Sequence, residues 1–171
     1  KGNALTIQGE ELDVDLSIRV LNDLYALLKK GYPLFPTDID YAIRMISDDR
    51  NVNLEDIFLD TVYISSRKRV ITPKSLAQKR YIDAIRKYDL VIGIGPAGTG
   101  KTYLAMAMAV ASLMKQEVER IVLTRPAVEA GEKLGFLPGD ISEKVNPYLR
   151  PLYDALHDMM DFDRASKLVE R

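Results

Sequence analysis

Residues 95–102, with the sequence GPAGTGKT, constrain the possible folds of this chain more than any other segment. They match the pattern G-x-x-x-x-G-K-[ST] at every fixed position, and loops with this pattern hold the phosphate groups of a nucleotide. The apolar run 90–94 before the loop has the length and composition of a strand buried on both faces. An Ala/Met/Leu-rich helix is predicted from residue 101 to residue 115. The alternative is an ordinary glycine turn that happens to carry Lys-Thr.

The residue types in this loop suit the chemistry of a polyphosphate. Glycines at 95, 98 and 100 allow backbone angles and close approaches that a Cβ would block, so N–H groups can surround an anion. The N-terminus of the following helix, with the positive end of its dipole, lies at the same point. We expect Lys101 to reach the β- and γ-phosphates and the Thr102 hydroxyl to ligate Mg²⁺, which makes both candidate catalytic residues.

The expected ligands are therefore ATP, or another nucleoside triphosphate, and Mg²⁺. The candidate nucleotide-binding residues of the loop are Gly95, Pro96, Ala97, Gly98, Thr99, Gly100, Lys101, Thr102 and Tyr103.

The remainder of residues 65–171 is predicted to form the N-terminal part of an α/β P-loop NTPase domain. Residues 75–88 carry apolar side chains on one helical face, and residues 120–124 are a second apolar run of strand length. Strand, loop, helix and strand make a βαβ unit with a right-handed crossover, so we expect a parallel sheet with helices. A last helix is predicted at 151–160.

Residues 1–64 are predicted to form a small α+β region. A strand at 4–8 is followed by a helix at 13–30, in which Leu16, Val20, Leu24 and Leu27 share one face. A second helix is expected to begin at an N-cap, Thr37, and a strand covers 61–64. The basic segment 65–73 is the expected boundary between the two regions.

Composition excludes several functional classes. The sequence has no cysteine, which excludes disulfide scaffolds and thiolate metal sites, and its single histidine, His157, leaves little for a zinc or iron site. No apolar run approaches the roughly 20 residues that a membrane helix needs, so no membrane association is expected. The formal net charge of −1 means that any basic nucleic-acid surface must be local. A cytoplasmic location is expected.

Gln78 lies on the helix that precedes the loop strand. A glutamine amide offers a donor and an acceptor that match the N6 and N7 edge of adenine, and Tyr81 one turn later offers an aromatic face. The alternative is a surface glutamine beside a half-buried tyrosine, and sequence spacing does not decide between the two.

Four further segments support a family resemblance. Residues 72–78 (TPKSLAQ), together with the loop, resemble superfamily 1 helicases, in which a glutamine upstream of the loop contacts adenine. Residues 123–140 (LTRPAVEAGEKLGFLPGD) and 146–154 (NPYLRPLYD) resemble the signature of the PhoH-like ATPases. Residues 3–48 are similar to that family's N-terminal region, the later part of a small KH-like module.

The resemblance implies a cytoplasmic ATPase associated with phosphate starvation, with a RecA-like, superfamily 1 helicase-like core. It implies action on RNA, assembly into a homo-oligomeric ring and an endoribonuclease partner. In this interpretation Gln78 contacts adenine, and Thr124 and Arg125 lie in the segment that follows the nucleic-acid backbone. Without the resemblance, Arg125 is a solvated charge at the end of a strand.

Hydrolysis by a P-loop enzyme also needs an apolar strand that ends in Asp, usually followed by Glu. No segment after Thr102 has this pattern, because residues 120–124 end in Thr-Arg and Asp140 follows Pro-Gly. PhoH-like chains carry this acidic motif further downstream. We therefore expect the chain to be a fragment that binds nucleotide without the full hydrolytic machinery.

Several charged groups have both a functional and an ordinary interpretation. Glu129 and Glu132 are either groups that position water or metal, or a solvated pair beside a turn. The densest basic cluster is either a contact for RNA phosphates or a solvated face; it consists of Arg67, Lys68, Arg69, Lys74, Lys79 and Arg80.

Two other functions stay open at the level of sequence. One is a P-loop kinase of a small acceptor, although the segment after Arg125 has few clustered arginines for a lid. The other is a structural RNA-binding module in which nucleotide controls assembly. No G-x-x-G loop occurs in residues 1–64, so a complete KH-type clamp is not visible.

Overall fold

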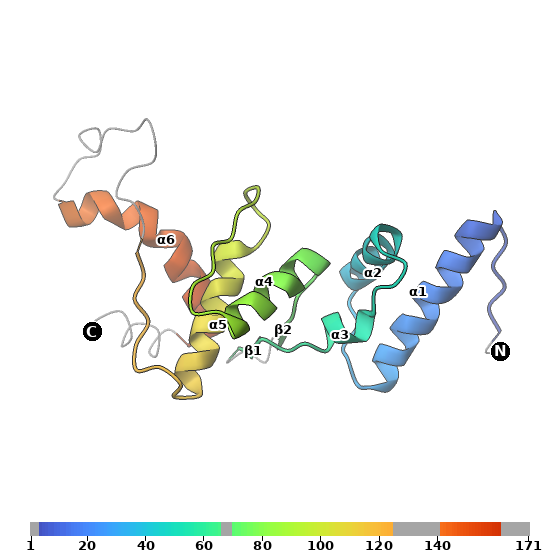
Figure 1. Cartoon of the computed structure of the whole chain (residues 1–171), viewed down its shortest axis with the longest axis horizontal. Coiled ribbons are helices and arrows are strands. Elements are labelled where there is room, and N and C mark those ends of the chain that lie inside the picture. The colour runs from blue at the N-terminus through green and yellow to red at the C-terminus, as the bar shows by residue number, and fades with distance from the viewer. Residues whose placement is uncertain (1–3, 66–69, 125–140, 162–171) are drawn as a thin grey trace. The chain divides into compact units, whose positions relative to one another are not determined.

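The computed structural model describes residues 4–65, 70–124 and 141–161 of the chain (Figure 1). The backbone divides into two compact units. Unit 1 comprises Lys1–Thr61 and Thr72–Ala84, and unit 2 comprises Val62–Ile71 and Ile85–Arg171. The chain therefore leaves unit 1 after Thr61, returns to it at Thr72 and enters unit 2 for the second time at Ile85. A single domain boundary at residues 64 and 65 stays a prediction.

Unit 1 is helical in its described residues. It contains α1 (Glu11–Lys29), α2 (Pro36–Asp48), α3 (Leu54–Phe58) and most of α4, whose full extent is Leu76–Lys87. Local signals explain the ends of these helices. Gly31 follows α1 with a φ of 82°, a conformation that glycine adopts without strain, and the Asn53 side chain caps α3 by accepting from Glu55 N at 3.0 Å.

The core of unit 1 lies where α1 packs on α2 and α3 (Figure 1). Val20, Leu24 and Leu27 are spaced so that α1 buries one stripe of its surface. The other buried residues of this core are Tyr32, Ala42, Met45, Ile46, Val52, Leu54, Ile57 and Phe58. At the rim, the Arg19 guanidinium donates to Val52 O at 2.7 Å and also to Arg50 O.

In its described residues, unit 2 contains one antiparallel strand pair, the end of α4 and two packed helices. In the pair, β1 (Tyr63–Ile64) lies beside β2 (Val70–Ile71), with Tyr63 opposite Ile71. Helix α5 (Lys101–Met114) packs on α6 (Ile141–Met159) and also contacts β1. The buried side chains of the two helices and the residue after α6 are Leu104, Met106, Ala107, Val110, Ala111, Ala155, Leu156, Met159 and Met160.

The predicted helices are confirmed, with corrections at their ends. The second helix begins at Pro36, so its N-cap is Phe35 and not Thr37. The last helix begins at residue 141 and not at 151, and it runs through Pro147 and Pro151. Prolines usually end a helix because they lack an N–H group, so the sequence favoured a later start. Packing of the C-terminal half of α6 against α5 outweighs that cost.

The predicted parallel sheet is not confirmed. Residues 90–94 and 120–124 carry no strand assignment, and Figure 1 draws both segments as plain coil. These side chains were expected to be buried on both faces of a sheet. Instead, Leu90, Ile92 and Ile94 are 81%, 78% and 93% exposed, and Val122 is 76% exposed. A strand exists only when a neighbour accepts and donates its backbone hydrogen bonds. The described part of the chain supplies no such neighbour to either segment.

The predicted α+β character of residues 1–64 is also not confirmed. Residues 4–8 carry no strand assignment, whereas the strand expected at 61–64 forms only over Tyr63–Ile64 and belongs to unit 2. The described residues of unit 1 therefore give no support to a KH-like sheet. Among the helices of the described residues, none is long and apolar enough to cross a membrane.

Candidate phosphate-binding site

The loop of residues 95–100 leads directly into α5. Gly100 is the N-cap of this helix, with a φ of 84°, and Gly98 has a φ of 75°. Residues other than glycine pay roughly 1–2 kcal/mol to adopt this left-handed conformation. The backbone path alone therefore favours glycine at two of the three glycine positions of the loop.

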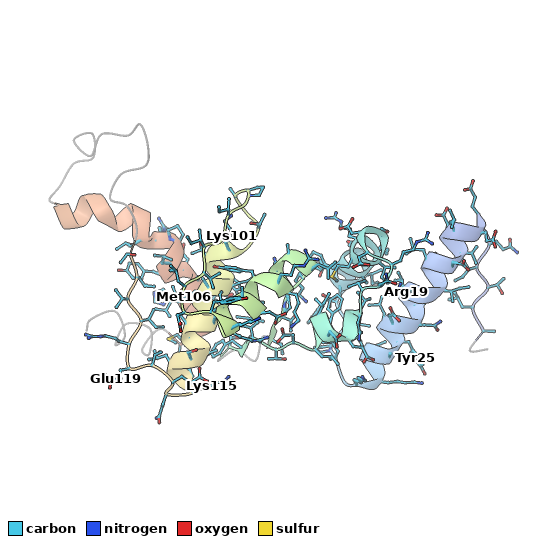
Figure 2. All side chains as sticks on the ribbon, viewed as in Figure 1. Arg19, Tyr25, Lys101, Met106, Lys115 and Glu119 are labelled. Atoms are coloured by element: carbon cyan, nitrogen blue, oxygen red, sulfur yellow. The ribbon has the colours of Figure 1, made fainter. Side chains whose placement is uncertain are left out.

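The Lys101 ammonium group turns back over the loop. Its Nζ donates to Gly95 O at 2.9 Å, to Pro96 O at 2.6 Å and to Thr99 Oγ1 at 3.2 Å. Thr99 Oγ1 in turn donates to Pro96 O at 2.9 Å, which braces the same turn. Figure 2 shows Lys101 at the loop end of α5 and Lys115 at the opposite end of the helix.

This arrangement fits a polyphosphate. The three acceptors of Lys101 Nζ are neutral, so its charge is solvated by the loop without being neutralised. The first bond of α5 runs from Leu104 N to Gly100 O at 2.9 Å, and the amides of the preceding turn have no acceptor within the helix. A cation and a helix N-terminus thus converge on one point. The exposed Thr102 side chain next to Lys101 offers a hydroxyl to Mg²⁺.

Gly95 differs from the other two glycines of the loop. Its φ is outside the left-handed region, and a Cβ added to it would lie 3.9 Å from Thr99 Oγ1 and 4.0 Å from Lys101 Cδ. These are ordinary contacts, so the fold does not require glycine at 95. The expected special backbone angle therefore occurs at Gly98 and Gly100 but not at Gly95. What remains for this position is close approach of a ligand.

Tyr103 contributes to the packing of α5 on α6. Its hydroxyl donates to Asp158 Oδ2 at 2.8 Å across the two helices. The Tyr103 side chain therefore serves a helix–helix contact, which the sequence did not predict. Its predicted part in nucleotide binding rests on its backbone in the first turn of α5.

Gln78 occupies the third position of α4, after Ser75. The Ser75 hydroxyl accepts from Gln78 N at 3.2 Å, and the Gln78 side-chain oxygen accepts from Lys74 N at 2.7 Å. This resembles a capping box, in which the side chains at both ends of the first turn satisfy backbone donors. Gln78 belongs to unit 1 and the loop belongs to unit 2. Tyr81 is half-buried on the same helix, and burial raises the pKa of its phenol.

A buried ionic cluster lies next to Gln78, and the sequence did not predict it. Lys74 Nζ donates to Asp38 Oδ1 and to the Tyr32 hydroxyl, each at 2.9 Å. Asp38 is 1% exposed, and its second oxygen accepts from Phe35 N at 3.0 Å. One feature of the sequence could have indicated part of this cluster. Asp38 lies in the first turn of a helix, where a carboxylate can accept from the backbone N–H that precedes the helix.

Opposing effects set the pKa of Lys74. Burial lowers the pKa, but the hydrogen bonds to Tyr32 and Asp38 and the charge of Asp38 raise it, and the result is a pKa above the ordinary 10.5. The ammonium also lies 5.2 Å from the centre of the Phe58 ring, a distance at which the ring attracts a cation. Lys74 is therefore held in its charged form at neutral pH.

The structure changes the interpretation of the basic cluster. Lys74 pairs with Asp38, and Lys79 pairs with Asp60 at 3.0 Å and with Asp83 at 2.6 Å. The bond to Asp83 is the main cause of the raised pKa of Lys79. Both lysines are thus partnered by carboxylates of the same chain and do not form a free basic face for RNA.

The structure gives less information on the other predicted site residues. Thr124 is exposed at the end of a described segment, while Arg125, Glu129, Glu132 and residues 67–69 lie outside the described residues. Within residues 4–65, 70–124 and 141–161, no three acidic or histidine side chains form a metal-binding group. His157 is half-buried on α6, as expected for a polar position on a helix.

Comparisons with known proteins agree on one family. The family model described as PhoH-like protein matches residues 70–171, which include the loop and Gln78. A PhoH-like protein of Mycobacterium tuberculosis (strain H37Rv) is 53% identical over 169 residues, which are 99% of this chain and 48% of that protein. A PhoH-like protein of Bacillus subtilis is 44% identical over 171 residues, 100% of this chain and 54% of that protein.

A further match covers less of the chain. Protein PhoH of Escherichia coli K12 is 48% identical over 86 residues, which are 50% of this chain and 24% of that protein. No solved structure matches the chain. The chain spans about half the length of the PhoH-like proteins that it matches from end to end.

Proposed function

Because this chain belongs to the PhoH-like protein family, a family of P-loop NTPases, we propose that it binds ATP and Mg²⁺ through residues 95–102. The geometry of Lys101 carries this proposal. Its ammonium group is held by neutral loop oxygens at the N-terminus of α5, where a triphosphate can replace those oxygens as its partner.

Each residue of the site has a proposed role. Lys101 binds the β- and γ-phosphates, and the Thr102 hydroxyl ligates Mg²⁺, which when bound offsets the negative charge of the phosphates. The amides that follow Gly98 and Gly100 donate to phosphate oxygens. Gln78 contacts the adenine edge.

ATP binding can be measured directly by titration calorimetry with MgATP. Lys101→Ala should weaken binding at least a hundredfold, because one of the two cationic contacts to the phosphates is lost while α5 keeps its packing. Lys115→Ala is the matched control, since Lys115 lies at the other end of α5 and is 3.8 Å from Glu117 in an exposed pair. Equal affinities of the wild type and Lys101→Ala would reject the site.

We further propose that the complete protein is a cytoplasmic ATPase, helicase-like in its core, that couples hydrolysis to RNA. The resemblance of residues 123–140 to the PhoH-like signature supports this role, and Thr124 and Arg125 are its candidate RNA contacts. A ring of identical subunits, an endoribonuclease partner and a link to phosphate starvation belong to the same proposal. The chain alone should hydrolyse ATP poorly, because no acidic motif of the required kind occurs in it.

The RNA proposal is tested on the complete protein. The rate of ATP hydrolysis should rise when single-stranded RNA is added, and Arg125→Ala should reduce that rise without changing the affinity for MgATP. A rate that no single-stranded RNA alters would contradict the coupling, and it would leave ATP binding by the loop unaffected.

A further inference from the structure

Helix α1 carries a second apolar stripe in addition to the one that it buries in the core of unit 1. The second stripe consists of Ile18, Leu21, Tyr25 and Leu28, which are 45%, 45%, 58% and 51% exposed. At 100° per residue, it lies roughly 120° around the helix from the side chains that α1 buries. All of α1 belongs to unit 1, so the second stripe is exposed in that unit by itself.

The spacing of the second stripe is that of a helix–helix contact. Positions 18, 21, 25 and 28 follow one another at alternating intervals of three and four residues. This is the a and d pattern of a coiled coil, in which each side chain enters a hole between side chains of a facing helix. A helix at the surface of a globular unit needs only one apolar stripe, the one that faces the core. The second stripe therefore indicates a contact with another helix.

The charges beside the second stripe indicate which helix that is. Asp15, Asn22 and Lys29 are exposed and follow one edge of the stripe at every seventh position. The Lys29 ammonium lies 4.6 Å from the centre of the Tyr25 ring, which places it next to the stripe. This edge is thus acidic towards the start of α1 and basic at its end. An edge of this kind is complementary to a copy of itself that runs in the opposite direction.

We propose that α1 is a dimerisation helix, which pairs in an antiparallel arrangement with α1 of a second copy of this chain. In this pair, Ile18 packs on Leu28 of the second copy and Leu21 packs on Tyr25 of the second copy. Asp15 faces Lys29 of the second copy, and each of these contacts occurs twice because the pair has two-fold symmetry.

The dimer does not depend on the proposed nucleotide function. A ring is closed by contacts between two different surfaces of neighbouring subunits, whereas the α1 pair uses the same surface on both copies. The pairing surface is small, because a standard stable interface takes about 20–30 residues from each partner. We therefore expect a reversible dimer with a dissociation constant on the order of 10 μM.

The test is sedimentation equilibrium of the 171-residue chain over a concentration range of roughly 1–300 μM, without nucleotide. The average mass should rise from the 19.3 kDa of the monomer towards twice that value. Leu21→Glu should raise the dissociation constant at least about a hundredfold, because two-fold symmetry places two carboxylates in the apolar contact. Leu12→Glu is the matched control, since Leu12 is 62% exposed and lies on the opposite side of the same helix, and it should leave the constant unchanged.

Charge exchange tests both the partner and its direction, and it keeps the proposal testable if Leu21→Glu does not fold. Asp15→Lys and Lys29→Asp should each weaken the dimer roughly tenfold, because like charges then face each other. The double variant, Asp15→Lys with Lys29→Asp, should regain the affinity, because both ion pairs form again with their signs exchanged. In a parallel pair these positions of the two copies would lie roughly 20 Å apart, and no recovery would occur.

Three results would overturn the proposal. One is a chain that stays monomeric over the whole concentration range. Another is a dimer whose dissociation constant Leu21→Glu and Asp15→Lys leave unchanged, because its contact then lies outside the second stripe. The third is a double variant that associates as weakly as the two single variants, which would contradict the antiparallel arrangement.

Discussion

Replacing Lys74 by methionine should destabilise unit 1 more than replacing Asp38 by asparagine. The reason is the unequal exposure of the two partners: the Asp38 side chain is 1% exposed and the Lys74 side chain 29%. Without Lys74, the Asp38 carboxylate stays buried and keeps the bond from Phe35 N. Without the carboxylate, Lys74 can still reach water.

The exposures set the magnitude of each effect. Removing one member of a buried ion pair costs about 3–5 kcal/mol. Partial exposure of Lys74 puts Lys74→Met at the lower end, about 3 kcal/mol. Asp38→Asn keeps the volume and one acceptor, so the loss is about 1–2 kcal/mol, the value of a weakened charged hydrogen bond. With an m value of about 2 kcal/mol/M in urea, the midpoints should fall by about 1.5 M and 0.5–1 M.

The assay must observe unit 1 alone, because the chain has two compact units. Native-state hydrogen exchange in increasing urea, followed by mass spectrometry of peptides from α1 and α2, meets this need. Lys30→Met serves as the control and should cost less than about 1 kcal/mol, because the Lys30 and Glu55 side chains of its ion pair are 52% and 31% exposed. If Asp38→Asn proved the more damaging substitution, the explanation from burial would be refuted.

Four other outcomes follow from the structure. The stabilisation by Lys74, whose folded-state pKa lies above 10.5, should be complete below pH 10.5 and be lost as the pH rises through the folded pKa; alkaline unfolding of Lys74→Met should lack that loss. Gly98→Ala, at a φ of 75°, should lower the unfolding free energy of unit 2 by about 1 kcal/mol, whereas Gly95→Ala should leave it unchanged and weaken only ATP binding, measured by calorimetry. Thr72→Val should stabilise unit 1 by about 1 kcal/mol in urea unfolding, because the buried Thr72 hydroxyl has no hydrogen-bond partner in the part of the chain that the structure describes. Tyr103→Phe removes the 2.8 Å bond to Asp158 and should cost about 1–2 kcal/mol by exchange of α6 peptides; no change would show that α5 and α6 are held by apolar contacts alone.

Local patterns predicted the helices and the glycine loop because their determinants lie close together in the sequence. The spacing of Val20, Leu24 and Leu27 defines the buried face of α1, and Gly31 ends the region of helical backbone. At the loop, special backbone angles were predicted for the glycines at 95, 98 and 100 and occur at Gly98 and Gly100, and the predicted start of the next helix at Lys101 is the start of α5. These features need no information from distant residues.

Features that depend on distant partners escaped prediction. The apolar runs 90–94 and 120–124 have strand composition, but pairing is decided by whichever segment lies beside them, and composition does not contain that information. The bond from Lys74 to Asp38 spans 36 residues, and no local pattern links the two. Tyr103 and Asp158 are 55 residues apart. The start of α6 was predicted too late because Pro147 and Pro151 disfavour a helix locally, whereas helix packing stabilises it.

The outward-facing apolar run before the loop has a consequence for how the protein behaves in solution. Leu90–Ile94 has no charge and no proline, and three of its five residues are at least 78% exposed. Unpaired backbone with this composition is an adhesive edge that another extended segment can join. A strand that pairs with Leu90–Ile94 would remove this edge and would therefore protect the protein from aggregation. The longer these five residues stay unpaired during folding, the more aggregation is expected.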